Sequence, residues 1–234
     1  AKVRKRKTVT ASKPSSNKVD DKNLLKIAKL FIGDDVLRPA MWGIHYKDGI
    51  VEATNAHKVF IIEQELNAEN GVYMPPGLFN PAKYKRHLED ELSKDYDKDT
   101  FLYEGSRFPN VSPVIPESQS YSHKIDFEKL YTYCLAVKPF TEKPKNEVMF
   151  LYGSREKIAY NVQYLIDCLK AMLLLGYKKG YAHIEANNRV TLLTPEIIYS
   201  HGQDVITALM PVMINNNNDT LAVSQDTNSE ENIL

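Results

Sequence analysis

Six histidines are the side chains of this sequence best suited to acid–base chemistry or to metal binding. They are His45, His57, His87, His123, His183 and His201. None forms an HExxH pair or a similar ligand spacing, and the sequence contains no P-loop, GxGxxG or GxSxG motif. His57 is the strongest candidate because it follows a predicted strand in EATNAHKVF, but a single histidine there is more often structural than catalytic. The sequence therefore predicts no catalytic residue, no metal site, no cofactor and no enzyme.

Composition and charge limit the function further. The 234 residues are 43% hydrophobic and 26% charged, which is ordinary for a soluble globular protein. The formal net charge is zero, so any attraction to nucleic acid or to a membrane must be local. No apolar run is long enough to span a membrane, and Cys134 and Cys168 lie in apolar helical patterns typical of buried, reduced thiols. We therefore expect a cytoplasmic protein.

One helix is predicted early in the chain, over residues 23–32. Asp20 or Asp21 can cap its start, and Gly33 ends it. Its apolar residues share one side, and on the other side three lysines repeat at i, i+4 and i+7. These are Lys22, Lys26 and Lys29. Such a basic stripe is either a contact surface for phosphates or a solvated helix face, and the pattern supports both equally.

Strand patterns follow this helix, and the second half of the chain repeats the order. Residues 41–46, 50–54 and 57–66 are strand-like, with a tight turn predicted at Lys47-Asp48-Gly49. In the second half Asp126 and Asn161 can cap helices. Strands are expected there at residues 148–153, 157–160, 180–186, 189–195 and 205–214. This order indicates an α+β fold with two related domains, each with helices packed on an antiparallel sheet.

Composition also suggests how the chain is divided. Residues 1–19 are basic and then Ser/Pro-rich, which indicates a disordered arm that either contacts phosphates or is simply solvated. Residues 20–116 and 117–214 are the two expected domains, and residues 215–234 form an Asn-rich, then acidic, disordered tail. The boundary is set by three prolines that exclude helix: Pro109, Pro113 and Pro116.

Three stretches carry motifs in a distinctive order. They are VEATNAHKVFI at 51–61, RFPNVSPVIP at 107–116, and YNVQYLIDCLKAM followed by ALMPVMI within 160–214. Together they resemble the bacterial DNA polymerase III β subunit, the sliding clamp. The first is similar to a strand ending in Ala-Thr-Asp-Gly-His-Arg-Leu in the clamp's second domain. The second is similar to the connection between its second and third domains, and the last two to a helix and the terminal strand of the third domain.

The resemblance implies a DNA-clamp fold made of the second and third clamp domains, with the first domain missing. Some features depart from the clamp pattern. Ala56 stands where clamps have glycine, and Pro113 and Met213 stand where they often have arginine. The third-domain half is shortened, because only about two strands fit between its helices. A phage or a mobile element is an expected source.

Clamp partners insert a short apolar peptide between the second and third domains, so the resemblance implies a partner-peptide pocket here. Small, flexible and apolar side chains such as methionine suit a groove that must accept varied ligands. ITALMPVMI at 206–214 would be both a core strand and one side of that pocket, although without the resemblance a core strand alone is the simpler interpretation. The implied pocket residues are Arg38, Met41, Thr54, Ala56, His57, Val59, Pro109, Pro113, Val114, Ala208, Met210, Pro211 and Val212.

The resemblance also implies that the helices face duplex DNA and contact its phosphates without sequence preference. The implied DNA-facing residues are Lys22, Lys26, Lys29, Lys124, Lys129, Lys170, Lys178 and Lys179. The expected function is a processivity factor that tethers a DNA polymerase or another replication protein. If two-domain chains close a ring of six domains, the homo-oligomer is a trimer. The alternative is a monomeric, clamp-derived interaction module that has lost DNA encirclement.

Overall fold

The computed structural model describes residues 21–33, 35, 38–74, 101–102, 108–115, 121–141, 147–152, 156–185, 189–196 and 205–212. Several predictions concern residues outside these ranges. They include the basic arm at 1–19, the tail at 215–234, Pro116 and Met213.

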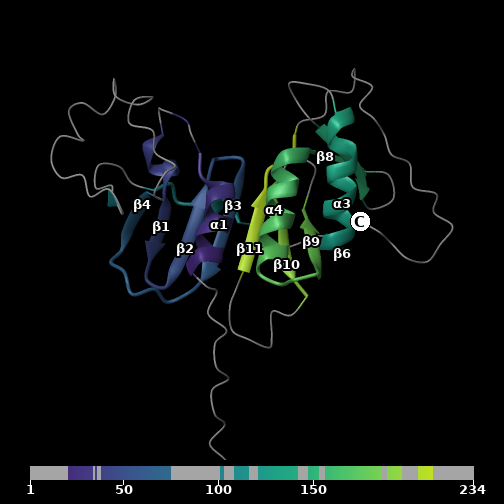
Figure 1. Ribbon diagram of the computed structural model, residues 1–234. Coiled ribbons are helices and arrows are strands. Elements are labelled where there is room, and N and C mark those ends of the chain that lie inside the picture. The colour runs from purple at the N-terminus through teal and green to yellow at the C-terminus, as the bar shows by residue number, and fades with distance from the viewer. Residues whose placement is uncertain are drawn as a thin grey trace, which may run out of the picture.

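Strands from both halves of the chain form one antiparallel sheet (Figure 1). Its order is β5-β4-β1-β2-β3-β11-β10-β9-β6, so the last strand of the chain pairs with β3 from the first half. The strands are β1 (Ile44–Lys47), β2 (Ile50–Thr54), β3 (Lys58–Glu63), β4 (Gly71–Met74), β5 (Phe101–Leu102), β6 (Tyr121–Asp126), β9 (Lys179–Ile184), β10 (Thr191–Pro195) and β11 (Val205–Leu209). One sheet runs through both halves of the chain. The division into two domains stays a prediction.

A separate hairpin lies beside the end of β11. It is formed by β7 (Glu147–Tyr152) and β8 (Glu156–Asn161), which pair with each other. Two residues beyond Met210, the Val212 N–H donates to the Ala159 carbonyl on β8 at 2.7 Å. The residues that follow β11, 210–212, therefore join the hairpin to the large sheet.

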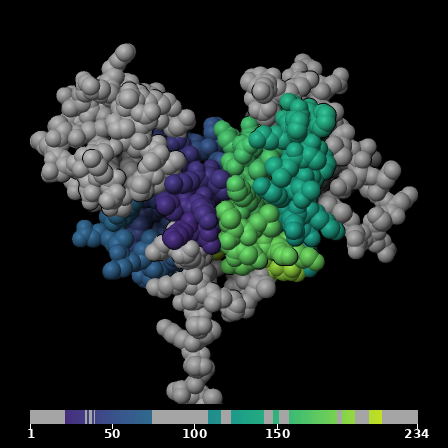
Figure 2. All heavy atoms as spheres, viewed as in Figure 1, coloured from purple at the N-terminus to yellow at the C-terminus, as the bar shows by residue number. Residues whose placement is uncertain are grey.

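In the described part of the chain, three α-helices cover one face of the large sheet: α1 (Asp21–Phe31), α3 (Phe127–Val137) and α4 (Val162–Leu174) (Figure 1). α4 lies between the other two and packs against both. Asp21, one of the two candidate caps of α1, is the first residue of that helix, and Asp20 lies outside the described residues. The cap predicted at Asp126 is confirmed, because its side chain accepts from the Lys129 N–H at 3.0 Å. Asn161 likewise accepts from the first N–H groups of α4. The three helices meet side by side as one continuous layer (Figure 2).

Alternation along the strands gives the sheet two apolar faces. On the helix side Phe31, Phe60 and Phe127 are fully buried in the main core. On the opposite side a smaller cluster forms from Val59, Val111, Val190, Leu192 and Ala208. We call this smaller cluster the outer-face cluster. The central strands are therefore buried on both sides, which explains why their sequences are almost continuously apolar.

Local departures from the sequence prediction have simple causes. Residues 41–46 were predicted to be one strand, but β1 starts at Ile44, after a short 3₁₀ helix at Pro39–Trp42. The prolines at 109–116 were expected to exclude helix, yet Ser112–Val114 forms one 3₁₀ turn, which tolerates proline at its start. β6 was not predicted, and β11 stops at Leu209, short of residue 214.

The tight turn predicted before β2 is confirmed. Asp48 and Gly49 both have positive φ, at 49° and 84°, as a two-residue hairpin turn requires. Elsewhere in the described part of the chain, no helix is long and apolar enough to span a bilayer.

Candidate functional site

The turn between β2 and β3 holds three of the implied pocket residues. The Thr54 hydroxyl donates to the Lys58 carbonyl at 2.9 Å and accepts from the Ala56 N–H at 3.1 Å. The Asn55 side-chain oxygen accepts from the N–H groups of His57 and Lys58, at 3.0 Å each. Side chains of the turn thus form hydrogen bonds with backbone groups of the same turn, which fixes the turn's conformation. The exposed His57 therefore has a defined backbone position.

Ala56 occupies the tightest point of this turn. Its φ is 73°, in the left-handed region that glycine adopts freely and alanine only with strain. This is the position where the clamp pattern has glycine. Ala56 therefore has the backbone conformation that glycine favours, although it is an alanine.

The end of β11 lies directly beside this turn. Ala208 pairs with Val59 in the sheet register, and the Met210 N–H donates to the His57 carbonyl at 2.9 Å. ITALMPVMI is thus a core strand as far as Leu209, and the described residues beyond it, 210–212, leave the strand. The half-buried residues of that segment are Met210, Pro211 and Val212.

Residues 108–115 form the cover of the sheet's outer face. Val111 is buried and packs in the outer-face cluster, against which the partly buried Met210 also packs. The other side chains of this segment are less buried, with Pro109 intermediate and Val114 45% exposed. Pro113 is exposed. The implied pocket residues Val59, Ala208 and Met210 therefore meet Val111 of this segment in or against one cluster.

The remaining two implied pocket residues, Arg38 and Met41, precede β1, and the Met41 N–H donates to the Arg38 carbonyl at 3.0 Å. The Met41 carbonyl accepts from the Gly33 N–H at 2.8 Å, and a Cβ on Gly33 would lie 3.5 Å from Asn55. Met41 is therefore close to the β2–β3 turn. Arg38 is exposed and pairs with Asp35 at 3.5 Å, so its described contacts stay within its own loop.

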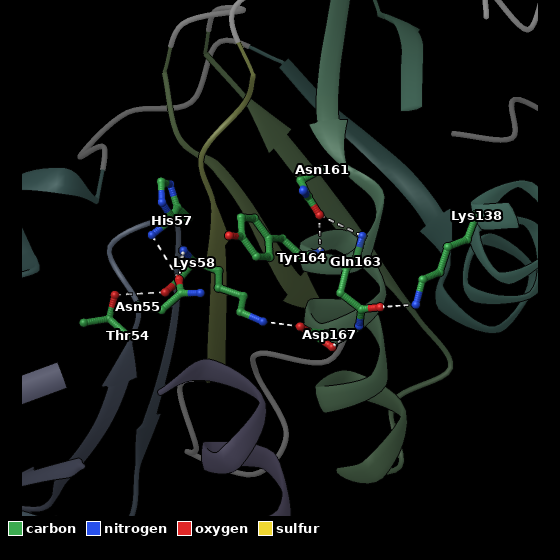
Figure 3. Close-up of polar contacts among 9 residues, drawn as sticks. All are labelled: Thr54, Asn55, His57, Lys58, Lys138, Asn161, Gln163, Tyr164 and Asp167. Atoms are coloured by element: carbon green, nitrogen blue, oxygen red, sulfur yellow. Dashed lines mark hydrogen bonds and ion pairs between the residues drawn. The ribbon is translucent and has the colours of Figure 1, made fainter. Parts of the chain in front are cut away.

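Tyr164 on α4 belongs to this region, and sequence reasoning missed it. Its ring stacks on the His57 ring with centroids 5.4 Å apart and planes 16° apart (Figure 3). The resemblance had matched the YNVQYLIDCLKAM helix, but the tyrosine was treated as part of a fold motif. Its contact with His57 depends on tertiary structure, because the two residues are far apart in sequence.

A buried ion pair lies beside this ring stack and was also missed. The Lys58 ammonium pairs with the Asp167 carboxylate, and the Lys58 side chain is only 4% exposed (Figure 3). The second carboxylate oxygen of Asp167 accepts from the Gln163 amide at 2.8 Å. The ammonium also lies 5.1 Å from the centre of the Tyr164 ring. An available signal was Asp167 itself, a lone carboxylate within the buried face of α4.

The implied DNA-facing lysines fall into two groups. Five are exposed on the helix layer: Lys22, Lys26 and Lys29 on α1, Lys129 on α3 and Lys170 on α4. Three lie on or next to β6 and β9: Lys124, Lys178 and Lys179. Lys124 forms an ion pair with Glu196, and Lys178 lies 3.9 Å from Glu128. The helix layer therefore carries a basic surface although the whole chain is neutral.

Burial shifts the pKa of several titratable side chains among the described residues. Burial raises the pKa of both Cys134 and Cys168 to about 12, which makes both thiols unreactive at neutral pH. Burial lowers the pKa of His183, whose two ring nitrogens lie 2.8 Å from the Ser122 hydroxyl and 2.7 Å from that of Thr194. Among the described residues, no cluster of three or more potential ligands could hold a metal ion.

Solved structures give a consistent comparison for this arrangement. The chain is similar to the DNA polymerase sliding clamp of Bacillus subtilis, with 13% identity, a TM-score of 0.60 and coverage of 83% of this chain and 62% of that one. It is similar to the DNA polymerase III β chain of Streptococcus pneumoniae, with 16% identity, a TM-score of 0.60 and coverage of 90% and 67%. A clamp from Bartonella birtlesii bound to griselimycin matches with 14% identity, a TM-score of 0.60 and coverage of 82% and 64%.

These matches establish the fold. The chain has the α+β architecture of bacterial DNA polymerase III β sliding clamps, as the sequence resemblance implied. It spans less than two thirds of the length of the Bacillus clamp. No protein-family model matches the sequence, and a search of curated proteins finds no match.

Proposed function

We propose that this protein is a sliding-clamp-like processivity factor without enzymatic activity. It holds duplex DNA against its helix layer and docks a DNA polymerase or another replication protein on the opposite side of the sheet. The observation that carries the proposal is the gathering of chain-distant residues around the β2–β3 turn within a clamp fold. We call the surface made by this turn, residues 210–212 and residues 108–115 the docking surface.

The docking surface has the composition that a partner peptide needs. Met210 and Val114 offer partly exposed apolar side chains, and the exposed His57 supplies a polar group next to Met210. Such a surface binds apolar anchors by contact area and orients them by a few polar groups. Griselimycin, which is bound by the Bartonella clamp, is a suitable probe.

The docking proposal is tested by titrating griselimycin into the purified protein in a calorimeter. Met210→Asp places a charge in the middle of the docking surface, so we expect it to abolish binding. Leu135→Asp is the matched control, because Leu135 is also partly exposed but lies on α3. Absence of binding to the unmodified protein, or equal losses in both variants, would contradict the proposal.

The DNA proposal rests on the basic surface of the helix layer. A Lys22→Glu, Lys26→Glu, Lys29→Glu triple variant should weaken binding to a short duplex. The slope of log K against the logarithm of the salt concentration should also become shallower by about 3, if all three lysines contact phosphates. Lys47→Glu is the matched control, since Lys47 is exposed at the β1–β2 turn, away from the helix layer. Fluorescence anisotropy over a salt series measures both quantities.

Encirclement of DNA requires a closed ring, which the mass in solution tests. Light scattering on a sizing column at several concentrations gives the number of chains in the assembly. A mass of three chains supports the trimeric ring. A mass of one chain at all concentrations, together with griselimycin binding, supports the alternative of a monomeric interaction module that has lost DNA encirclement.

A further inference from the structure

The docking surface contains residues from both halves of the chain. Two side-chain contacts beside the β2–β3 turn join the first half to the second. His57 and Lys58 are consecutive residues that lead into β3. Tyr164 and Asp167 lie one turn apart on α4. The first pair of side chains meets the second pair twice, once in the His57–Tyr164 ring stack and once in the Lys58–Asp167 ion pair.

The two contacts differ in exposure. The ring stack includes an exposed histidine, so solvent competes with it and it is weak by itself. The ion pair is buried, with side-chain exposures of 4% for Lys58 and 11% for Asp167. A buried pair with a further hydrogen bond, here from Gln163 to Asp167 at 2.8 Å, has one well-defined geometry.

Aromatic rings complete the surroundings of the lysine. The ammonium lies 5.5 Å from the centre of the Phe31 ring and 5.1 Å from that of Tyr164. The Tyr164 ring therefore has the ammonium of Lys58 near it as well as the ring of His57. Any shift of Lys58 relative to α4 would change both contacts of Tyr164 together.

We propose that Lys58 and Asp167 are positioning residues of the docking surface. Their ion pair sets the place of the β2–β3 turn relative to α4 and so holds the His57 and Tyr164 rings against each other. Tyr164 thereby becomes part of the surface that a ligand meets. The effect on ligand affinity rests on the proposed function, whereas the effect on the two rings does not.

The decisive variant is Lys58→Met with Asp167→Leu, which removes both charges and keeps side-chain volume. Replacing a buried ion pair by apolar residues commonly preserves stability, so this double variant separates folding from positioning. Asp167→Asn, which keeps the side-chain shape and removes the charge, gives a second test. Glu196→Gln is the control, because it breaks the Lys124–Glu196 ion pair at the β6 edge of the sheet and leaves every lysine in place.

The first measurement is made on the free protein by NMR. Stacking on Tyr164 shifts the His57 ring protons upfield, and Tyr164→Leu defines their position without the stack. We expect the double variant to move these resonances most of the way to the Tyr164→Leu position while the thermal midpoint stays close to that of the unmodified protein. Asp167→Asn should move them in the same direction, and the control variant should leave them in place.

The second measurement is griselimycin affinity, which should fall about tenfold in the double variant, equivalent to 1.4 kcal/mol of binding free energy. The single variant Lys58→Arg, which keeps the positive charge opposite Asp167, should lose less griselimycin affinity than the double variant. If the double variant folds with unchanged His57 resonances, the positioning role is wrong. If it does not fold, unchanged resonances in Asp167→Asn overturn the role equally. If the unmodified protein fails to bind griselimycin, the docking proposal fails, and the NMR result still decides the positioning role.

Discussion

The two faces of the large sheet are built in different ways. The helix-covered face packs three fully buried phenylalanines and the apolar sides of three helices into the main core. The outer face is covered near its centre by residues 108–115 and has a small cluster of mostly valine, leucine and alanine. Yet the residues implied in docking gather around the outer face and the turn at its edge. Among the described residues, the sheet thus separates a face covered by helices from a face covered by residues 108–115, where we propose that a partner docks.

The largest expected effect comes from a matched pair of adjacent leucines in β10. Leu193 faces the main core and Leu192 faces the outer-face cluster, and each is 2% exposed. Leu193→Ala should lower the free energy of unfolding by about 3–4 kcal/mol, because helices on a rigid sheet cannot fill the cavity. Leu192→Ala should cost about 2–3 kcal/mol, since the covering segment can move inward. Urea denaturation measures the free energy of unfolding of both variants. Equal losses would contradict the expected difference between the two faces of the sheet.

Val111 tests how the covering segment is held. Val111→Ala removes its buried anchor, and we expect a cost of about 2 kcal/mol from lost burial and a small cavity. The loss should be local, so hydrogen exchange at the Val114 amide, which donates to the Val111 carbonyl at 3.0 Å, should accelerate more than exchange within α4. Uniform acceleration throughout the protein would instead show that the cover and the main core unfold together.

Ala56 and Ala53 form a second matched pair, with a smaller expected effect. Ala56→Gly should raise the free energy of unfolding by up to about 1 kcal/mol, because it relieves the strain of φ 73°. Ala53→Gly, at a fully buried strand position, should lower it by about 1.5 kcal/mol through lost burial and added chain entropy. Chemical denaturation gives both values. A destabilising Ala56→Gly change would mean that the turn carries no such strain.

The smallest expected effect is a pH dependence from the outer face. Burial lowers the pKa of His183 below its ordinary value of 6.5. Above pH 6.5 the imidazole is neutral in both the folded and the unfolded chain. As the pH falls below 6.5, the unfolded chain binds the proton first, so the free energy of unfolding decreases until the pH passes the lowered pKa of the folded state. His183→Gln should therefore flatten the profile between pH 7.5 and 5.5, and an unchanged profile would contradict this.

Local sequence determined many of the elements correctly. The capping side chains of Asp126 and Asn161, the Asp48-Gly49 turn and the helical apolar periodicity act over a few residues, so they are readable without the fold. β6 was missed because it follows a proline-rich segment, and its pairing with β9 involves residues more than fifty positions away. The extent of ITALMPVMI as a strand was overestimated for the same reason. β11 ends where its partner strand begins, at Lys58.

The site shows the same division. Motif order in the sequence pointed to a clamp fold and to the segments that gather around the β2–β3 turn. Only the tertiary structure brought Tyr164 onto His57 and paired Lys58 with Asp167 across 109 residues. The physical reason is that periodicity and caps report the environment of a residue along its own element. The partner of a buried charge or ring is set by how distant elements pack, and a single sequence carries no local signal for that choice.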